Sequence, residues 1–274
     1  MRCREGRSRL PTEVVPGCTV RGVGEVEVSY PVLGSVDEAT SCGTRVLLMG
    51  RPPKFTEDAL LDAALTIVAQ DGAAATTAAI ATAAGAKPGS LYYRFPNREV
   101  LLLTLWVRSI RRFQAVFLAA ARSSADPDEA LVAAAVTIPR YCREHPGEAQ
   151  ALRLFRHKEV LRRLDAGEGE LTVCPAELRE AVRGLNDEVY KVFSELTWRR
   201  FGTLDRLELV RLAVHQTAYG LVRPFLGPGS EPMPCWLDDM VAAMVPHALA
   251  VGDRPGGLLE DPDSPPPSRQ VTAR

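Results

Sequence analysis

A cluster of cationic, hydroxyl and aromatic side chains occupies one short stretch of this 274-residue chain. The cluster consists of Lys87, Ser90, Tyr92, Tyr93 and Arg94. Side chains of these types donate hydrogen bonds to phosphate oxygens and to base edges in the grooves of DNA. Leu91 and Phe95 lie four residues apart in the same stretch, so they would bury the other face of a helix. The pattern predicts a short helix with one face in a protein core and one face free for a DNA groove.

Two preceding helices would position this cluster. The first is predicted from about Thr56 to Asp71, because its apolar residues recur at helical spacing and Thr56 can cap its N-terminus. A short helix follows over residues 77–84, and Gly85 permits the tight turn into a third helix over residues 88–95. Two short helices joined by a glycine-containing turn form the helix-turn-helix arrangement.

The stretch from Thr77 to Leu101 strongly resembles the TetR (tetracycline-repressor-like) family of bacterial regulators. Its motif is Ile-Ala…Ala-Gly…Gly-Ser-Leu-Tyr…Phe…Arg…Leu, and the match extends back over the first helix. The resemblance implies an all-α fold, in which an N-terminal three-helix helix-turn-helix DNA-binding domain precedes a C-terminal helical ligand-binding and dimerisation domain. The C-terminal part resembles the family in architecture only.

The resemblance also implies which residues touch DNA. By their places in the motif, these are Thr77, Lys87, Pro88, Gly89, Ser90, Tyr92, Tyr93, Arg94 and Arg98. Thr77 would meet a phosphate at a helix N-terminus, and Tyr93 would donate its hydroxyl to another. Arg98 stands where the family usually has a phosphate-binding lysine, and Arg51 and Lys54 would add contacts from an N-terminal arm. For Tyr92 the alternative is a core residue, and for Arg94 and Arg98 an ordinary surface residue.

Lys87 departs from the family pattern. The family usually has Ser or Thr at this position, just before the recognition helix. A lysine side chain cannot cap a helix as a hydroxyl does, so the capping role is in doubt and a positive charge is added beside the DNA.

The rest of the chain is predicted to be helical as well. Further helices are expected over residues 98–123, 128–144 (with a kink at Pro139), 147–164, 175–201, 205–226 and 234–250. The resemblance implies that the last two pair with those of a second copy in a four-helix dimer interface. The residues that would form it are Leu207, Leu209, Val210, Leu212, Ala213, Val214, Ala218, Gly220, Leu221, Val222, Val241, Ala242, Met244 and Val245. The alternative for each is burial within one chain.

An effector cavity among the body helices is a further implication of the resemblance. Candidate lining residues are Trp106, Phe113, Phe117, Tyr141, Phe155, His157, Tyr190, Trp198 and His215, with Arg140, Phe193 and Gln216 as further candidates. Aromatic residues at helical spacing are also ordinary core residues, which is the alternative for most of them. No cofactor is expected.

Charge and cysteine usage limit the class of protein. The net charge is −1, but residues 49–112 carry eight Lys or Arg against five Asp or Glu, while residues 113–251 carry sixteen against nineteen. A slightly basic segment on a slightly acidic body suits a small nucleic-acid-binding module. The six cysteines show no C-x-x-C spacing, so we expect neither a disulfide framework nor a metal site, and Cys142-x-x-His145 fits a helix end. No apolar run reaches the roughly 18 residues of a membrane span, and we expect a cytoplasmic protein.

Both ends of the chain differ from its middle. Residues 1–48 show no helical period, and only four of the 33 Lys and Arg residues are Lys, a usage that suggests a GC-rich genome with long chance reading frames. We therefore expect Met49 to be the natural start, with residues 1–48 a wrongly assigned or disordered N-terminal extension. Residues 252–274 predict a disordered tail. The DNA-binding domain would span residues 49–97, and the effector-binding and dimerisation domain residues 98–251.

These features predict a ligand-responsive regulator of transcription that is not an enzyme. It would bind a palindromic operator on double-stranded DNA as a homodimer, in the family's usual role of repressor, and a small-molecule effector would release it. One alternative is a DNA-binding protein or an activator without a small-molecule effector. A remote alternative is a helical enzyme, although the sequence contains no Ser/His/Asp set, H-E-x-x-H motif or phosphate loop.

Overall fold

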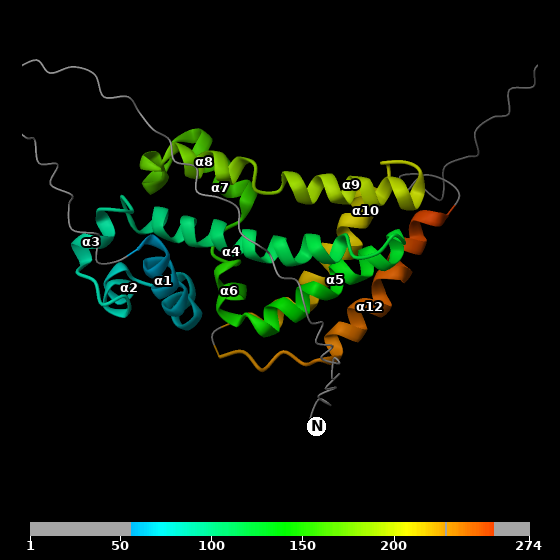
Figure 1. The fold of residues 1–274 in the computed structure, drawn as a ribbon, viewed down its shortest axis with the longest axis horizontal. Helices are drawn as coiled ribbons and strands as arrows, with labels where there is room; N and C mark the ends of the chain where they lie inside the picture. Colours follow the sequence, from blue (N-terminus) through cyan, green and yellow to red (C-terminus); the bar gives the residue numbers. More distant parts are fainter. Residues whose placement is uncertain (1–55, 228, 255–274) are drawn as a thin grey trace, which may run out of the picture. The chain divides into compact units, whose positions relative to one another are not determined.

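The computed structural model describes residues 56–227 and 229–254, and every regular element in those residues is a helix (Figure 1). The predicted all-α fold is therefore confirmed. The expectations for residues 1–48, for the arm residues Arg51 and Lys54, and for the tail beyond Arg254 lie outside the described residues.

Three short N-terminal helices form the head of the molecule. They are α1 (Glu57–Asp71), α2 (Thr77–Ala83) and α3 (Pro88–Tyr92), with a 3₁₀ turn at Gly72–Ala74 between the first two. Thr56 caps α1 as predicted, since its Oγ1 accepts from the Ala59 amide at 3.2 Å. Thr76 caps α2 in the same way through the Ala79 amide, also at 3.2 Å. Both caps satisfy amides that an α-helix leaves without an internal partner.

One hydrophobic core holds the head together. Its buried side chains come from α1, α2, α3, the turn after α3 and the beginning of the next helix: Leu60, Ala64, Val68, Ile80, Ala81, Leu91, Phe95, Leu101 and Leu105. Leu91 and Phe95 are only 1% and 4% exposed, so the predicted inner face of the recognition helix is confirmed. Burying that face fixes the direction in which the opposite face points.

Helix α4 (Arg98–Ala121) connects the head to the body. Asn97 caps it, with Oδ1 accepting from the Val100 amide at 2.8 Å, as the sequence predicts. Its 24 residues span about 36 Å at the usual rise of an α-helix. It packs against α1 of the head and continues through the body (Figure 1). One rigid element is thus shared by the two parts.

The body is built from eight further helices in the described residues. They are α5 (Pro127–Glu144), α6 (Pro146–Ala151), α7 (His157–Ala166), α8 (Ala176–Arg183), α9 (Asp187–Phe201), α10 (Leu207–Arg211), α11 (Thr217–Val222) and α12 (Trp236–Leu249). Helix α5 packs against both α4 and α12 and contributes most of the central core. Pro139 lies inside α5 without ending it.

The helix predicted over residues 147–164 is wrong as a single element. The chain leaves α6 after Ala151 and enters α7 only at His157. In the connecting segment, Leu154 and Phe155 pack against both the head core and the core around Trp106. Filling the space between two cores requires a bend, so tertiary packing overrides the local helical pattern.

A second predicted helix, over residues 175–201, is also divided in two. Helix α8 ends at Gly184, which has low helix propensity, and Leu185 turns inward and is buried. Asn186 then bonds to side chains from two other segments: its Oδ1 accepts from Gln114 at 3.1 Å, and its Nδ2 lies 3.1 Å from Nδ1 of His157. A short 3₁₀ segment at Gly169–Val173, which the sequence did not indicate, precedes α8.

The segment predicted as a helix over residues 205–226 changes its winding in the middle. Residues Leu212–Gln216 form a π-helical segment between α10 and α11, and a 3₁₀ turn follows at Arg223–Phe225. The Thr217 hydroxyl donates to the Leu212 carbonyl at 2.9 Å and so helps to satisfy the wider turn. Such π-turns widen a helix locally and redirect the side chains that they carry.

The last described residues pack against the body. A 3₁₀ turn covers Ala250–Asp253, and Gly252 is buried where a Cβ atom would come within 2.8 Å of Phe201 and Leu209. Asp253 accepts from both terminal nitrogens of Arg200, at 2.9 and 2.7 Å. The backbone is therefore held against α9 and α10 at this point.

Candidate DNA-binding site and effector cavity

The turn between α2 and α3 sets the orientation of the recognition helix. Gly85 has a φ of +64°, a conformation that other residues adopt only with strain. Lys87 occupies the N-cap position of α3 in extended conformation, and its side chain makes no capping hydrogen bond. The predicted loss of the cap at this departure from the family is therefore confirmed, and the Lys87 side chain is exposed.

The outward face of α3 presents most of the predicted DNA-contacting groups. Lys87, Gly89 and Ser90 are exposed, and Tyr92 and Tyr93 are 52% and 89% exposed. Tyr92 is thus a surface residue rather than a core residue. A tyrosine that is almost wholly exposed gains little from burial, so Tyr93 is well placed for an external partner.

Thr77 and Arg94 lie at the edge of this surface and are half-buried. The hydroxyls of Thr77 and Tyr92 lie 3.3 Å apart, which links the start of α2 to the end of α3. The predicted residues from the two helices of the motif are therefore neighbours in space. Their use in binding DNA stays a prediction.

Arg98 takes part in the internal structure of the head. Its Nε donates to the Ala75 carbonyl at 2.7 Å and its Nη2 to the Ala73 carbonyl at 2.5 Å. The guanidinium thus fastens the start of α4 to the segment that leads into α2. This bidentate arrangement gives Arg98 a structural contact beside the phosphate contact that the resemblance implies.

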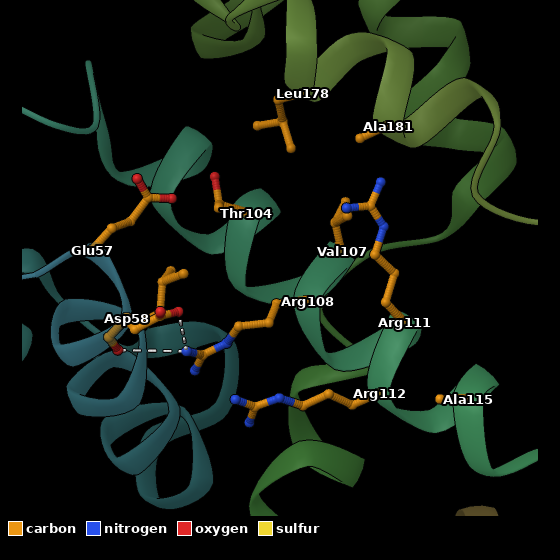
Figure 2. A pocket seen from close by; sticks show the side chains of 11 residues that line it. Glu57, Asp58, Thr104, Val107, Arg108, Arg111, Arg112, Ala115, Leu178 and Ala181 are labelled. Carbon is orange, nitrogen blue, oxygen red and sulfur yellow. Dashed lines mark hydrogen bonds and ion pairs between the residues drawn. The ribbon is translucent and has the colours of Figure 1, made fainter. Parts of the chain in front are cut away.

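The head and the body meet at a shallow depression of about 460 Å³ lined by α1, α4 and α8 (Figure 2). Arg108 extends from α4 toward α1, where it pairs with Asp58 at 3.6 Å and with Asp62 at 2.9 Å. Asp58 and Asp62 are one helical turn apart, so a single arginine can pair with both. These ion pairs link the head to the helix that continues into the body.

A second cavity, of about 590 Å³, lies inside the body. Five predicted effector residues line it, namely Phe113, Phe117, Phe155, His157 and His215, together with the further candidate Gln216. The π-helical segment carries His215 and Gln216, so the irregular winding places two polar side chains at this wall. The volume falls within the range of cavities that hold drug-sized ligands.

Four predicted effector residues do not line the cavity. Trp106 is buried behind it, where its Nε1 donates to the Leu152 carbonyl at 3.2 Å and its ring contacts Phe155. Tyr141 packs edge-on against Phe113 and donates its hydroxyl to Glu148. Tyr190 and Trp198 are 47% and 59% exposed on α9. Of the further candidates, Phe193 belongs to the core and Arg140 pairs with Asp238 at 3.0 Å.

Several lining residues were missed by the sequence reasoning. They include Gln114, Cys142, Tyr219, Arg153, Arg156 and Arg223. Gln114 could have been found, because it is a polar residue within an apolar helical stripe. In the structure its amide donates to the Leu185 carbonyl at 2.9 Å. The arginines carried no signal, because their position depends on the bends after α6 and α11.

Burial fixes the protonation of the polar groups around the cavity. Nε2 of His157 lies 2.7 Å from the Val182 carbonyl, which can only accept, so this nitrogen carries the proton. Burial, and then the Arg211 guanidinium, lower the pKa of His215. Burial raises the pKa of Cys142 to about 12. His215 and the Cys142 thiol are therefore uncharged near neutral pH.

Helix α12 is apolar on two faces. Its inner face is buried in the core of the same chain and consists of Leu237, Val241, Val245 and Leu249. A second stripe of the same helix, one turn after another, remains uncovered and includes Trp236, Met240 and Met244, which are 57%, 39% and 37% exposed. Of the residues predicted for a dimer interface, Leu212, Gly220 and Met244 are exposed, whereas the following are buried within the chain: Val210, Ala213, Val214, Ala218, Val222, Val241 and Val245.

Among the described residues, no group of three or more His, Cys, Asp or Glu side chains has the arrangement of a metal site. Within the same part of the chain, no helix combines the length and the apolar character needed to cross a membrane.

Comparison with known proteins agrees with this geometry. The model of the bacterial regulatory proteins of the tetR family matches residues 60–105. A transcriptional regulator from Rhodococcus sp. RHA1 has the same fold, with a TM-score of 0.53 and 18% identity over 72% of this chain and 97% of that chain. The TetR-family regulator PfmR from Thermus thermophilus gives 0.52 and 22% over 72% and 97%, and the fatty acid degradation regulator FadR from Bacillus halodurans gives 0.50 and 19% over 70% and 94%. No curated protein sequence matches the chain.

The family model covers α1 to the first turns of α4, which are the elements that position the exposed face of α3. The two solved regulators each align with 72% of this chain, so the likeness in fold extends beyond the head. The chain therefore carries the DNA-binding domain of the bacterial regulatory proteins of the tetR family at its head, and it shares the fold of solved TetR-family regulators.

Proposed function

We propose that this chain is a ligand-responsive transcriptional regulator that binds a near-palindromic operator as a homodimer and leaves it when a small molecule enters the body. The observation that carries this proposal is the pairing of an exposed recognition helix with a cavity of about 590 Å³ in the part of the chain joined to it by α4. In the family's usual role the protein would be a repressor.

The head would bind DNA through two kinds of contact. Tyr93, Thr77 and the α3 surface would meet phosphates and fix the orientation of the head, while Lys87, Ser90 and Tyr92 would contact base edges in the major groove. The exposure of Tyr92, Tyr93 and Lys87 supports this assignment. A lysine at the start of the recognition helix favours guanine, which offers two acceptors in the major groove.

A second copy of the chain would cover the outer stripe of α12. Large apolar side chains such as Trp236, Met240 and Met244 are costly to leave in water, and Leu212 of the π-helical segment is 45% exposed. Two-fold pairing through this surface would set two recognition helices about 34–36 Å apart, or a multiple of one DNA turn.

Helix α6 offers a path from the cavity to the head. Ala149 on this helix lines the cavity, while Gly147 lies against Leu65 and Ala69 of α1. Between them, Glu148 accepts from Arg112 of α4 at 2.7 Å and from Tyr141 of α5. A ligand that displaces Ala149 would therefore move a short helix fastened to α1, α4 and α5 at once.

Such a switch requires the ligand to bind the two geometries of the protein with different affinities. Moving a 99:1 preference for the DNA-binding geometry to 1:99 needs about 5.5 kcal/mol of difference between the ligand's affinities for the two geometries. The ligand must therefore make contacts in one geometry that the other lacks.

The proposal is tested by binding-site selection with the purified full chain on random duplexes. We expect one near-palindromic site, protected as two half-sites. Tyr93→Phe should weaken binding to every sequence alike, and Lys87→Ala should also relax the preference at one base pair of each half-site. Tyr190→Phe, which removes a hydroxyl from another exposed tyrosine, on α9, is the control. Selection of no sequence would overturn the operator assignment.

The effector part is tested on the selected site with a library of small molecules. At least one compound should release the dimer from the operator, and a cavity-filling Ala149→Met substitution should weaken the response to that compound. If no compound weakens operator binding, a regulator without a small-molecule effector remains.

A further inference from the structure

We infer that the cavity selects an amphipathic anion, that is, a molecule with an apolar alkyl or aromatic body and one terminal carboxylate or similar acid group. The inference rests on the proposed effector function and names the class of ligand. It is carried by the distribution of apolar and cationic side chains around the cavity.

The inner part of the cavity is apolar. Phe117 and Ile138 are each 2% exposed, Cys142 is 5% exposed and Ala149 is fully buried, and all four line the cavity. The Cys142 thiol is protonated and so behaves as a small apolar group. A ligand group placed here is stabilised only because apolar surface is removed from water.

Three polar side chains of the cavity wall already have partners. Asn186 bonds to Gln114 and lies within hydrogen-bond distance of His157, whose other ring nitrogen donates to the Val182 carbonyl. Gln114 donates a second hydrogen bond to the Leu185 carbonyl. These side chains hold the wall together, so they leave little hydrogen-bonding capacity for a ligand.

The charged lining residues are all cationic. Arg153 and Arg156 follow α6, Arg223 follows α11, and all three are exposed while lining the cavity. No Asp or Glu is among the described residues that line it. Since the arginines are exposed and the apolar side chains are buried, the positive charge lies at the mouth and the apolar surface at the inner end.

These arginines differ from most others in the described chain. Arg140, Arg143 and Arg200, for example, pair with aspartates at 2.7–3.0 Å. Among the residues that the structure describes, no carboxylate pairs with Arg153, Arg156 or Arg223. Arg153 has one long contact, at 3.5 Å, with the Gln150 amide oxygen. Three guanidinium groups at one opening, with no carboxylate partner in the described part of the chain, attract an anion and repel a cation.

The geometry therefore favours one orientation of the ligand. The apolar body would lie against Phe117 and Ile138, and the acid group would lie among the three arginines, where it accepts hydrogen bonds without losing all its water. A neutral molecule of the same shape would lack the second interaction. A cationic one would face like charge.

The test uses the purified full chain and probes that differ only in charge. N-phenylnaphthylamine, a neutral fluorescent probe, reports uptake, and decanoate, decanol and decylamine then compete with it below their aggregation concentrations. Decanoate should displace the probe at about one-tenth of the concentration needed for decanol or less, and decylamine should be the weakest competitor.

Two double variants locate the effect. Arg156→Gln/Arg223→Gln should weaken competition by decanoate about tenfold and leave decanol unchanged. Arg111→Gln/Arg122→Gln removes the same charge from two exposed positions, one on α4 and one just after it, and should change neither competitor. Neither residue lines the cavity, and Arg111 lines the separate depression beside α1. Equal decanol and decanoate affinities, or equal effects of the two double variants, would overturn the inference while leaving an effector cavity. Failure of the wild-type chain to take up any of the probes would count against the effector cavity itself.

Discussion

Gly147 of α6 lies so close to Ala69 of α1 that a Cβ atom at position 147 would be 3.4 Å from the Ala69 Cβ. This contact joins the head to a helix that lines the proposed effector cavity. A single methyl group fits at that distance, whereas a larger side chain does not.

We therefore expect Gly147→Ala to retain the stability and operator affinity of the wild-type chain. Gly147→Leu should cost about 1–3 kcal/mol through overpacking and should weaken operator binding, because α1 must move away from α6. Urea denaturation and operator titration measure the two effects. Full operator affinity in Gly147→Leu would show that the head does not depend on this contact.

Substitution of Arg98 by lysine should destabilise the fold more than the same substitution at a surface arginine. Its two hydrogen bonds to the Ala73 and Ala75 carbonyls need the forked guanidinium, which a single ammonium cannot replace. Arg98→Lys should lower the free energy of unfolding by about 1–2 kcal/mol, while Arg111→Lys should leave it unchanged. Equal stability of the two variants would leave Arg98 with a phosphate contact alone.

Lys87→Ser should change stability and DNA affinity in opposite directions. Serine can cap α3, which Lys87 does not, so the head should gain about 0.5–1 kcal/mol of stability. Loss of a charge beside the phosphates should weaken operator binding and reduce the slope of its salt dependence by about one. Thermal unfolding and titration at several salt concentrations measure both. Unchanged salt dependence would place Lys87 away from the DNA.

The outer stripe of α12 predicts a change in assembly. Met240→Asp/Met244→Asp should yield a monomer in sedimentation velocity, because two charges would be buried in the proposed interface. Val116→Asp, at a 47% exposed apolar residue of α4, is the matched control and should not alter the sedimentation coefficient. A dimer in the methionine variant would move the interface to another surface.

The lowered pKa of His215 predicts that the folded chain loses stability in weak acid. Because burial and Arg211 lower its pKa in the folded chain, the unfolded chain binds a proton first, near the ordinary histidine pKa of about 6.5. Stability from this residue is therefore present above that pH and is lost as the pH falls toward the lowered value. Denaturation at pH 7.5 and 5.5 should show a smaller difference in His215→Gln than in the wild type. An equal difference would assign the acid sensitivity to other groups.

The sequence alone determined the head. The spacing of Leu91 and Phe95, the caps Thr56 and Asn97, and Gly85 in the turn are local signals, because each acts within a few residues of the chain. They predict α1 to the start of α4 and the outward face of α3. The departure at Lys87 was predictable for the same reason, since capping depends on one side chain and the adjacent amides.

Only the tertiary structure decided the body. The breaks before His157 and after Arg183, and the π-helical segment at His215, arise because distant side chains must fill shared cores. Those bends bring Arg156 and Arg223 to one opening and leave Trp198 on the surface. Helical periodicity predicts which face of a helix is apolar. Long-range packing decides whether that face lies in a core, lines a cavity or contacts a second copy of the chain.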